Sequence, residues 1–333
     1  MARIVIALLA LALLGAVAFA FAIGPYALTV DDVSRAFARL AGYGDGAPTP
    51  AEIVLLNVRL PRIGAAILVG AALAAAGAAY QTIFRNPLVS PDILGVSTGA
   101  GLGAALGILF SLPVVLIEAL AFAGGLVTVV LVTAVATAVQ THDRVLVLVL
   151  AGIVVGALAG AAISLIKVLA DPYDQLPAIT FWLLGSLAGA KGIDVTAVVP
   201  PVALGLGLLW LLRWRVTVLS LGDDEARALG IDVVRLRATI IAAATLATAS
   251  VVAISGVVGW IGLLIPHMAR MLVGPQVARL LPTAALMGAG FLLLVDTLAR
   301  TLARVETPIG ILTAIIGAPV FIFLLQRARR AWG

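Results

Sequence analysis

The sequence contains no cysteine and has little charge. Of its 333 residues, 11% are Asp, Glu, Lys or Arg and 63% are hydrophobic. The absence of cysteine excludes disulfides and thiolate metal sites. A soluble protein carries about 25% charged residues, so the shortage of charge excludes an ordinary soluble fold. A mean hydropathy of +1.20 instead predicts an integral membrane protein, and the net charge of +5 is then no sign of nucleic-acid binding.

Motifs for nucleotide hydrolysis and for metal binding are also missing. The sequence has no Gly-x-x-x-x-Gly-Lys-Ser/Thr segment, which a phosphate-binding loop of that type requires. Its two histidines, His142 and His267, are far apart in the sequence, and two isolated histidines do not make a metal site. We therefore expect neither nucleotide hydrolysis nor a bound metal on this chain.

Long apolar runs, separated by polar or proline-containing turns, predict an all-α polytopic membrane protein with ten transmembrane helices in one domain, residues 1–333. A run of about 20 residues crosses the roughly 30 Å hydrocarbon core. The run 178–187 is too short to cross and is expected at the membrane interface. The ten predicted spans are 4–23 (expected to stay uncleaved), 63–80, a run from Gly95, 116–139, 145–169, 194–212, 236–254, 257–272, 281–302 and 309–325.

Two polar stretches interrupt these runs. Residues 24–62 form the longest, and Thr29 with Asp32 resembles a capping box that would begin a short surface helix near 30–40. The second stretch, 220–237, has acidic residues where a short helix would begin and Gly230 where it would end. Both stretches are expected outside the membrane.

The distribution of basic residues predicts the orientation. With ten spans, 13 of the 21 lysines and arginines fall on the side of both termini and of the 220–237 stretch. Positive residues accumulate in cytoplasmic loops, so this side is predicted to be cytoplasmic and the 24–62 loop external. The eight basic residues of the other side are Arg35, Arg39, Arg59, Arg62, Lys167, Lys191, Arg300 and Arg304.

Small residues recur at helical spacing within the spans. Gly70, Ala74 and Gly77 lie in the second span, and Gly152, Gly156 and Gly160 share one face of the fifth. Small residues let membrane helices approach closely. We expect both faces to pack against neighbouring helices.

Ionisable residues mark the outer ends of two spans. Arg59 and Arg62 flank Pro61 three residues apart, and Asp296 precedes Arg300 by four, a spacing that predicts an ion pair on one helix face. The arginines could be interfacial anchors that extend toward water or a basic site for an acidic partner. The sequence chemistry leaves both readings open.

Five groups of motifs follow one another along the chain. They are Arg59-Leu60-Pro61-Arg62, Asn86-Pro87-Leu88 with Pro91 and Leu94-Gly95-Val96-Ser97, Leu221-Gly222-Asp223 with Ala226-Arg227 and Leu229-Gly230, Gly259-Trp260-Ile261-Gly262-Leu263 with Ile265-Pro266-His267, and Pro308-Ile309-Gly310 with Gly317-Ala318-Pro319-Val320-Phe321. Together they resemble the motifs of the FecCD family, the permease subunits of type II ABC importers for ferric siderophores, haem and cobalamin. The resemblance covers nearly the whole chain and implies the type II permease fold.

The resemblance also implies roles for three groups of residues. Arg59, Arg62 and Arg300 would receive acidic residues of a substrate-binding protein. Asn86, Pro87 and Leu88 would form part of a cytoplasmic gate, whose other element, 141–144, matches the family poorly. An ATPase would bind the coupling region, about 219–232, through Leu221, Gly222, Asp223, Ala226, Arg227, Leu229 and Gly230.

The implied assembly lies in the cytoplasmic membrane of a prokaryote, with both termini inside. It contains a second copy of this chain or a close homologue, two ATPase subunits that bind ATP and Mg, and a soluble binding protein; no cofactor is expected on this chain itself. The implied function is uptake of an iron chelate. Haem, cobalamin and a molybdate-type oxyanion remain alternative substrates, and an ion-coupled secondary transporter is a rival class, disfavoured because coupled acids in mid-membrane are few.

Overall fold

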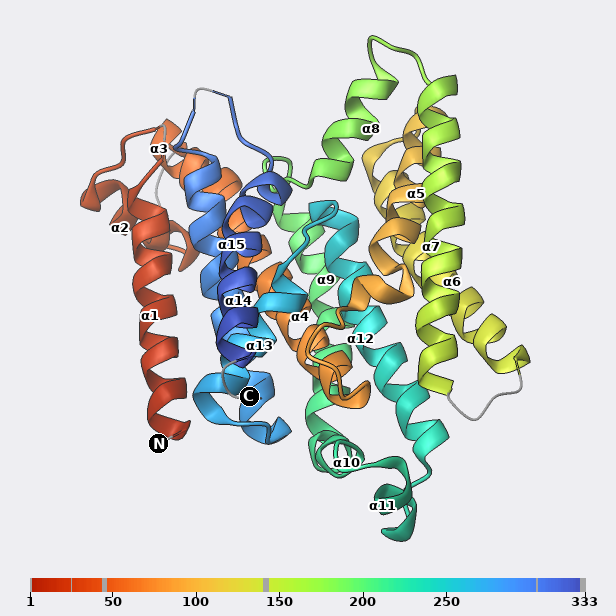
Figure 1. The fold of residues 1–333 in the computed structure, drawn as a ribbon. Coiled ribbons are helices and arrows are strands. Elements are labelled where there is room, and N and C mark those ends of the chain that lie inside the picture. Colours follow the sequence, from red (N-terminus) through yellow and green to blue (C-terminus); the bar gives the residue numbers. More distant parts are fainter. Residues whose placement is uncertain (1, 25, 44–46, 140–143, 304, 330–333) are drawn as a thin grey trace.

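The computed structural model describes residues 2–24, 26–43, 47–139, 144–303 and 305–329. Within these ranges every regular element is a helix and no strand occurs (Figure 1). The all-helical prediction is therefore confirmed. Among the described residues, seven helices are long and apolar enough to cross a membrane. They are α1 (Ala2–Ala22), the continuous helix Pro50–Ile83, α6 (Val114–Ala138), α7 (Arg144–Leu169), α9 (Gly192–Leu211), α12 (Val233–Ser255) and α14 (Val277–Ala299).

Four further apolar helices are shorter in their described parts. They are α5 (Val96–Leu109), α8 (Gln175–Leu184), α13 (Ile261–Val273) and Ile309–Leu324, which is the fully described part of α15 (Ile309–Arg329). The runs expected as the third and eighth spans thus form helices of 14 and 13 residues. The 14-residue helix follows a short 3₁₀ turn and the 13-residue helix follows an irregular segment, 256–260. Gly95 and Trp260, which directly precede the two helices, both have positive φ. The count of ten complete spans stays a prediction.

The remaining elements are short. A 3₁₀ turn, η2 (Pro91–Leu94), precedes α5. Helix α2 (Val30–Leu40) lies in the first polar stretch, α11 (Asp223–Ala228) lies in the second, and α10 (Arg213–Leu219) comes directly before the second. The predicted surface helix near 30–40 is confirmed as α2. The short helix expected in the second polar stretch is confirmed as α11.

The central helix contains a local change of winding. It begins as α3 (Pro50–Ile53), continues as the π-helical segment η1 (Val54–Arg59) and becomes α4 (Leu60–Ile83) without a break. Pro61 lies just after the π segment and has no N–H to donate to the preceding turn. Wider π winding next to a proline lets the helix continue where an α-helical ladder would clash. Arg59, the last residue of η1, therefore lies in a distorted turn of the helix.

Close approach of α4 to its neighbours depends on glycines. A Cβ placed on Gly70 would collide with the backbone of Gly288 in α14, and one on Gly77 would collide with Gly262 in α13. The predicted packing of this small-residue face is confirmed. In α7 only Gly152 makes such a contact, whereas no atom lies within 4 Å of a Cβ built on Gly156 or Gly160.

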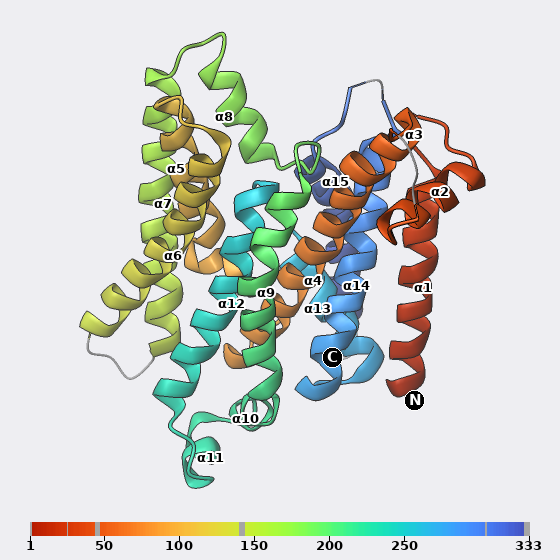
Figure 2. The same cartoon turned by 180° about the vertical axis from the view of Figure 1, so that it is seen from behind.

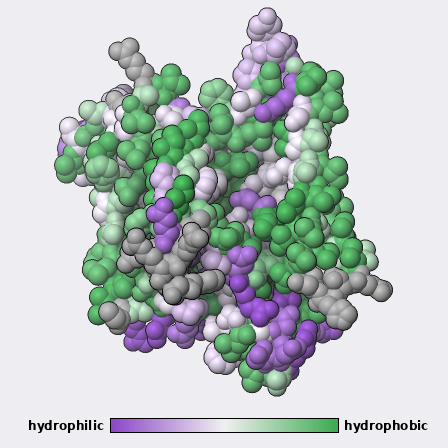
Figure 3. All heavy atoms as spheres, in the orientation of Figure 1, coloured by the Kyte–Doolittle hydropathy of each residue, from purple (hydrophilic) through white to green (hydrophobic). Residues whose placement is uncertain are grey.

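The two polar stretches lie at opposite ends of the molecule. In both views the beginning of α1, the end of α15 and the α10–α11 segment share one end, whereas α2 and α3 lie at the other (Figures 1 and 2). Between the two ends, apolar side chains cover much of the visible surface, and hydrophilic residues gather around α10 and α11 (Figure 3). This arrangement is the one expected of a membrane protein, with an apolar belt between two polar ends.

Candidate functional sites at the two ends of the molecule

Three arginines from separate elements are enclosed at the α2–α3 end. Arg59 ends η1, Arg62 lies in the first turn of α4 and Arg300 follows the last residue of α14. Their exposed fractions are only 3%, 6% and 6%. They are close enough for the charges of Arg59 and Arg62 to act on Arg300. The structure thus brings together the three residues expected to receive a partner, but it buries them.

Arg62 is held by two carboxylates. Its Nε lies 2.9 and 3.0 Å from the two carboxylate oxygens of Asp296, and its terminal nitrogen Nη1 lies 2.7 Å from Glu306 Oε1. A planar guanidinium can bind two acids at once because its five N–H groups point in fixed directions. The Asp296 side chain is 1% exposed, whereas that of Glu306 is 42% exposed. One acid is therefore internal and the other faces water.

The expected ion pair between Asp296 and Arg300 is wrong. Among the described residues Asp296 pairs with Arg62, 234 positions away in the sequence. Arg300 instead donates to the backbone oxygen of Ala20 at 2.6 Å. Spacing of four allowed the local pair, but the packing of α14 on α4 gives Asp296 a fork-shaped donor that binds both of its oxygens.

Arg59 and Arg300 both stabilise the end of α1. Arg59 donates to the backbone oxygens of Phe21 and Tyr26, and Arg300 donates to that of Ala20. The last carbonyls of a helix lack partners within the helix, and cations are favourable there. Two of the three arginines thus connect the first span to α4 and α14. Their contact with a binding protein stays a prediction.

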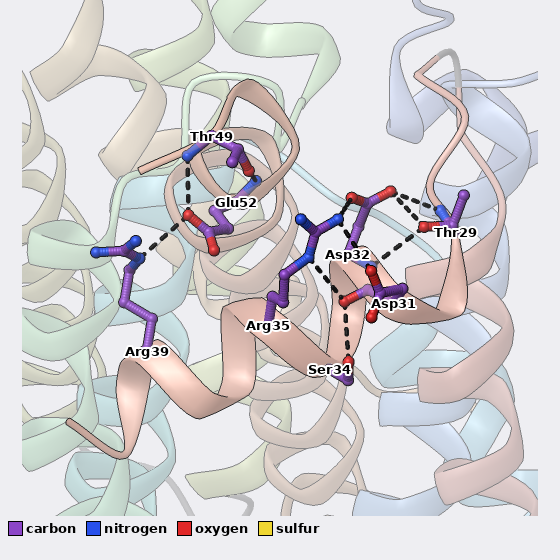
Figure 4. A network of polar contacts seen from close by, with 8 residues as sticks. All are labelled: Thr29, Asp31, Asp32, Ser34, Arg35, Arg39, Thr49 and Glu52. Carbon is purple, nitrogen blue, oxygen red and sulfur yellow. Dashed lines mark hydrogen bonds and ion pairs between the residues drawn. The ribbon is translucent and has the colours of Figure 1, made fainter. Parts of the chain in front are cut away.

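The first polar stretch contains a small hydrogen-bonded unit (Figure 4). Thr29 and Asp32 form the predicted capping box of α2, and hydrogen bonds from Thr29 hold the pKa of Asp32 below its ordinary value. Arg39 at the end of α2 donates to Glu52 at 3.1 Å, and Glu52 also accepts from the backbone N–H of Thr49. Glu52 therefore completes the capping box at the start of α3 and fixes α2 beside it.

Asn86, Pro87 and Leu88 lie in the turn that follows α4. Arg85 has a φ of 49°, and the Asn86 side-chain oxygen accepts a hydrogen bond from the Leu88 N–H at 2.9 Å. This Asx turn ends the helix, and the Leu88 side chain is exposed. The predicted interruption is confirmed. The gating role stays a prediction, and residues 141–143 of the other proposed gate element lie outside the described residues.

The coupling region contains a short helix with defined ends. Gly222 precedes α11, and three acidic residues occupy its first turn. At the other end Gly230 has a φ of 76°, its N–H donates to Arg227, and the Ile231 N–H donates to Ala226. This is the Schellman arrangement, in which a left-handed residue terminates a helix and satisfies its last carbonyls.

An ion pair fixes α11 to the next span. Arg237 of α12 donates to both carboxylate oxygens of Asp223, at 2.8 and 3.3 Å. Partial burial raises the pKa of Asp223, but the hydrogen bonds and charge of Arg237 outweigh it, so the pKa lies below the ordinary value. Leu221 and Leu229 remain exposed, by 68% and 65%. Leu229 and Trp214 also line an open groove of about 680 Å³ between α10 and α12.

Comparison with known proteins identifies the family. A model of the FecCD transport family matches residues 9–327. The chain belongs to the FecCD transport family. It is similar to the "Probable iron chelatin transport system permease protein" of Helicobacter pylori (strain ATCC 700392 / 26695), with 43% identity over 84% of both chains. It is also similar to the molybdate import system permease protein MolB of Haemophilus influenzae (strain ATCC 51907 / DSM 11121 / KW20 / Rd), with 39% identity over 92% of this chain and 91% of that one.

A solved structure agrees with this assignment to the FecCD family. An inward-facing ABC transporter chain, described as of the metal-chelate type, matches with a TM-score of 0.88 and 38% identity over 98% of this chain and 99% of that one. The protein is therefore a multi-pass ABC transporter permease of the FecCD family with a type of fold already seen in such transporters. Its relatives differ in the substrates that their names state.

Sequence reasoning missed two acid–base contacts. It assigned no role to Glu306, whose one signal was its place two residues before the Pro308-Ile309-Gly310 motif. It also named Asp223 without its partner Arg237, 14 residues later. Both partners lie on other elements, so no short-range spacing rule pointed to them.

Proposed function

We propose that this chain is the membrane-spanning subunit of an ATP-driven importer that carries a ferric chelate, such as a siderophore, across the cytoplasmic membrane. Two copies would enclose one pathway, two ATPase subunits would bind at the α10–α11 end, and a soluble binding protein would deliver the chelate to the α2–α3 end. Both termini would then be cytoplasmic.

The observation that carries the proposal is the separation of two different polar sites by an apolar body in a FecCD chain. One end has an arginine cluster with more cations than carboxylates, which suits an acidic partner because charge complementarity orients the docking of two proteins. The opposite end has α11, a helix with capped ends and exposed leucines, which suits a firm contact with another subunit.

The proposed mechanism is alternating access. ATP-driven closure of the ATPase subunits would move α11, and the Asp223–Arg237 pair would pass this movement to α12. The turn at Asn86–Leu88 would open or close the inner end of the pathway. The chain itself would hold neither ATP nor Mg, since both would bind to the ATPase subunits.

An iron chelate is proposed as substrate because the relative from Helicobacter pylori is named for iron chelatin and the matching structure is of the metal-chelate type. The similarity to MolB supports a molybdate-type oxyanion as a second candidate. Substrate choice would reside mainly in the binding protein, since charged residues are few along the spans of this chain.

The test is uptake into proteoliposomes that contain this chain, its ATPase and the binding protein. ATP-dependent accumulation of a radiolabelled ferric siderophore is the expected result, with unlabelled haem, cobalamin and molybdate as competitors. Competition by molybdate alone would transfer the proposal to the oxyanion. Uptake that needs an ion gradient but no ATP would refute the importer class.

A further inference from the structure

The two carboxylates that hold Arg62 are not equivalent. Asp296 belongs to a packed transmembrane helix and is almost fully enclosed, while Glu306 is half-exposed and lies in the connection between α14 and α15. A guanidinium that binds one internal and one exposed acid can exchange the exposed one without losing the other. Glu306 thus occupies the position at which a carboxylate from outside would reach Arg62.

The cluster has a surplus of positive charge. Within the described residues it contains three guanidinium groups, from Arg59, Arg62 and Arg300, and the two carboxylates of Asp296 and Glu306. The Nε of Arg300 is buried and has no hydrogen-bond partner there. Buried donors and buried cations are unfavourable without a partner. The site therefore attracts a carboxylate from outside, which can compete with Glu306 for Arg62.

The backbone next to Glu306 joins the cluster to other elements. The Thr307 N–H donates to the Ala299 oxygen at 3.2 Å, and the Ile309 N–H donates to the Gly185 oxygen, which follows α8, at 2.9 Å. Earlier in the same connection, Leu302 and Val305 are 64% and 74% exposed. Glu306 is therefore the side chain that fixes a largely exposed connection to Arg62, close to where α15 begins.

We propose that Glu306 is an internal stand-in for the carboxylate of the binding protein. In the free transporter it neutralises Arg62 and holds the α14–α15 connection against α4. On docking, a partner carboxylate replaces it, and the connection is released at the point where it meets α15 and the residue after α8. The inference rests on the proposed docking role of the arginines. It adds that the loss of the Glu306–Arg62 contact transmits the docking event to the membrane helices.

The exchange predicts an unusual sign for a mutation. Removing a charge that contributes to docking would weaken the complex, but removing a competing charge strengthens it. In Glu306→Gln the amide oxygen can still accept a hydrogen bond, yet the charge that competes with the partner is gone. We expect a Kd about three- to tenfold lower than that of the unmodified protein, chiefly at low salt.

The experiment uses the complete transporter with its ATPase in nanodiscs and the binding protein that supports uptake. Binding is measured for the unmodified protein, Glu306→Gln and the control Asp31→Asn. Asp31 is an exposed acid paired with Arg35 in the same outer region, so its removal changes the net charge equally. Tighter binding of Glu306→Gln alone is the expected result. Unchanged or weaker binding of this variant would overturn the proposal and make Glu306 a structural brace.

A second readout does not depend on affinity. A spin label on Val305→Cys, in a chain without native cysteine, should gain mobility when the binding protein docks. It should already be more mobile in the Glu306→Gln background, because a neutral amide binds Arg62 more weakly than a carboxylate does. A label that stays immobile in a docked complex would also overturn the exchange. By contrast, if neutralising the acidic residues of the binding protein leaves its affinity unchanged, then the docking role of the arginines fails instead.

Discussion

At the scale of single residues, both oxygens of the Asp296 carboxylate accept hydrogen bonds from Arg62 inside the packed end of α14. Replacement by alanine would leave Arg62 with only the exposed Glu306. Removing one member of a buried pair costs about 3–5 kcal/mol because the remaining charge lacks compensation. We expect Asp296→Ala to lower the free energy of unfolding by this amount, measured by denaturant unfolding in mixed micelles.

The control for this variant is again Asp31→Asn, whose ion pair with Arg35 is exposed. Exposed ion pairs contribute little to stability, so this variant should unfold like the unmodified protein. Equal unfolding curves for both variants would mean that the Arg62–Asp296 pair is no more important for stability than a surface pair.

The residue scale also shows the limit of sequence reasoning. Asp296 was recognisable as unusual because ionisable residues are rare within apolar runs, and the arginines were recognisable because they form part of a motif. Which acid pairs with which base was not recognisable. Asp296 has a local candidate in Arg300, and only the packing of α14 against α4 decides for Arg62.

At the scale of elements, the contact between α4 and α14 depends on glycine at one position and not at a neighbouring one. A Cβ on Gly288 would collide with the backbone of Gly70, whereas a Cβ on Gly290 would meet no atom within 4 Å. We expect Gly288→Ala to destabilise the protein by about 1–3 kcal/mol, because two backbones must separate. Thermal unfolding of the purified permease provides the measurement.

Gly290→Ala is the matched control on the same helix. Alanine restricts the unfolded chain and favours the helix, so this change should be neutral or stabilising by up to about 1 kcal/mol. Similar destabilisation by both substitutions would show that the loss comes from α14 itself and not from its contact with α4.

A third prediction concerns how α11 is fixed to α12. Because the pKa of Asp223 is lowered from 3.8 by Arg237, the pair contributes its full stability above that value and loses it as the pH falls through the lowered pKa. At neutral pH the pair is therefore intact. Asp223→Asn should increase hydrogen exchange of the amides in 223–231, while the exposed control Asp224→Asn should not. Equal exchange in the two variants would contradict a special role for the pair.

Local rules predicted the short polar helices well and the membrane elements less well. The ends of α2 and α11 follow from nearby capping residues, such as Thr29 and Gly230, so the sequence contains the necessary information. Hydropathy could not separate α13 from the segment before it, since both are apolar. The break there depends on backbone turns at Gly256 and Trp260, which both have positive φ. Gly256 packs against the backbone of Trp182, and the Trp260 ring packs against Phe321.

At the scale of the whole molecule, composition and basic-residue asymmetry predicted a helical membrane protein with its two polar stretches on opposite sides. The structure has this arrangement (Figures 1 and 2). Composition could not determine how many helices are complete spans, because the short helices α5 and α13 begin inside apolar runs. The number of complete spans depends on where the chain turns within the membrane layer, and hydropathy does not show the position of such turns.

The last prediction is the orientation of this molecule in the membrane. Tyr43, beyond the end of α2, and Leu221, before α11, are 83% and 68% exposed and belong to opposite ends of the structure. Basic residues are more numerous on the side of α11, and positive loops are retained in the cytoplasm. In intact cells a membrane-impermeant maleimide should therefore label Tyr43→Cys and leave Leu221→Cys unlabelled, and permeabilisation should expose the second site. Because the chain has no cysteine of its own, each signal reports one position. The reverse pattern would place the α11 end outside the cell and remove the basis for an ATPase contact there. Labelling of both sites in intact cells would show that the cells were not sealed. The same test is then made in inverted vesicles, in which only Leu221→Cys should react.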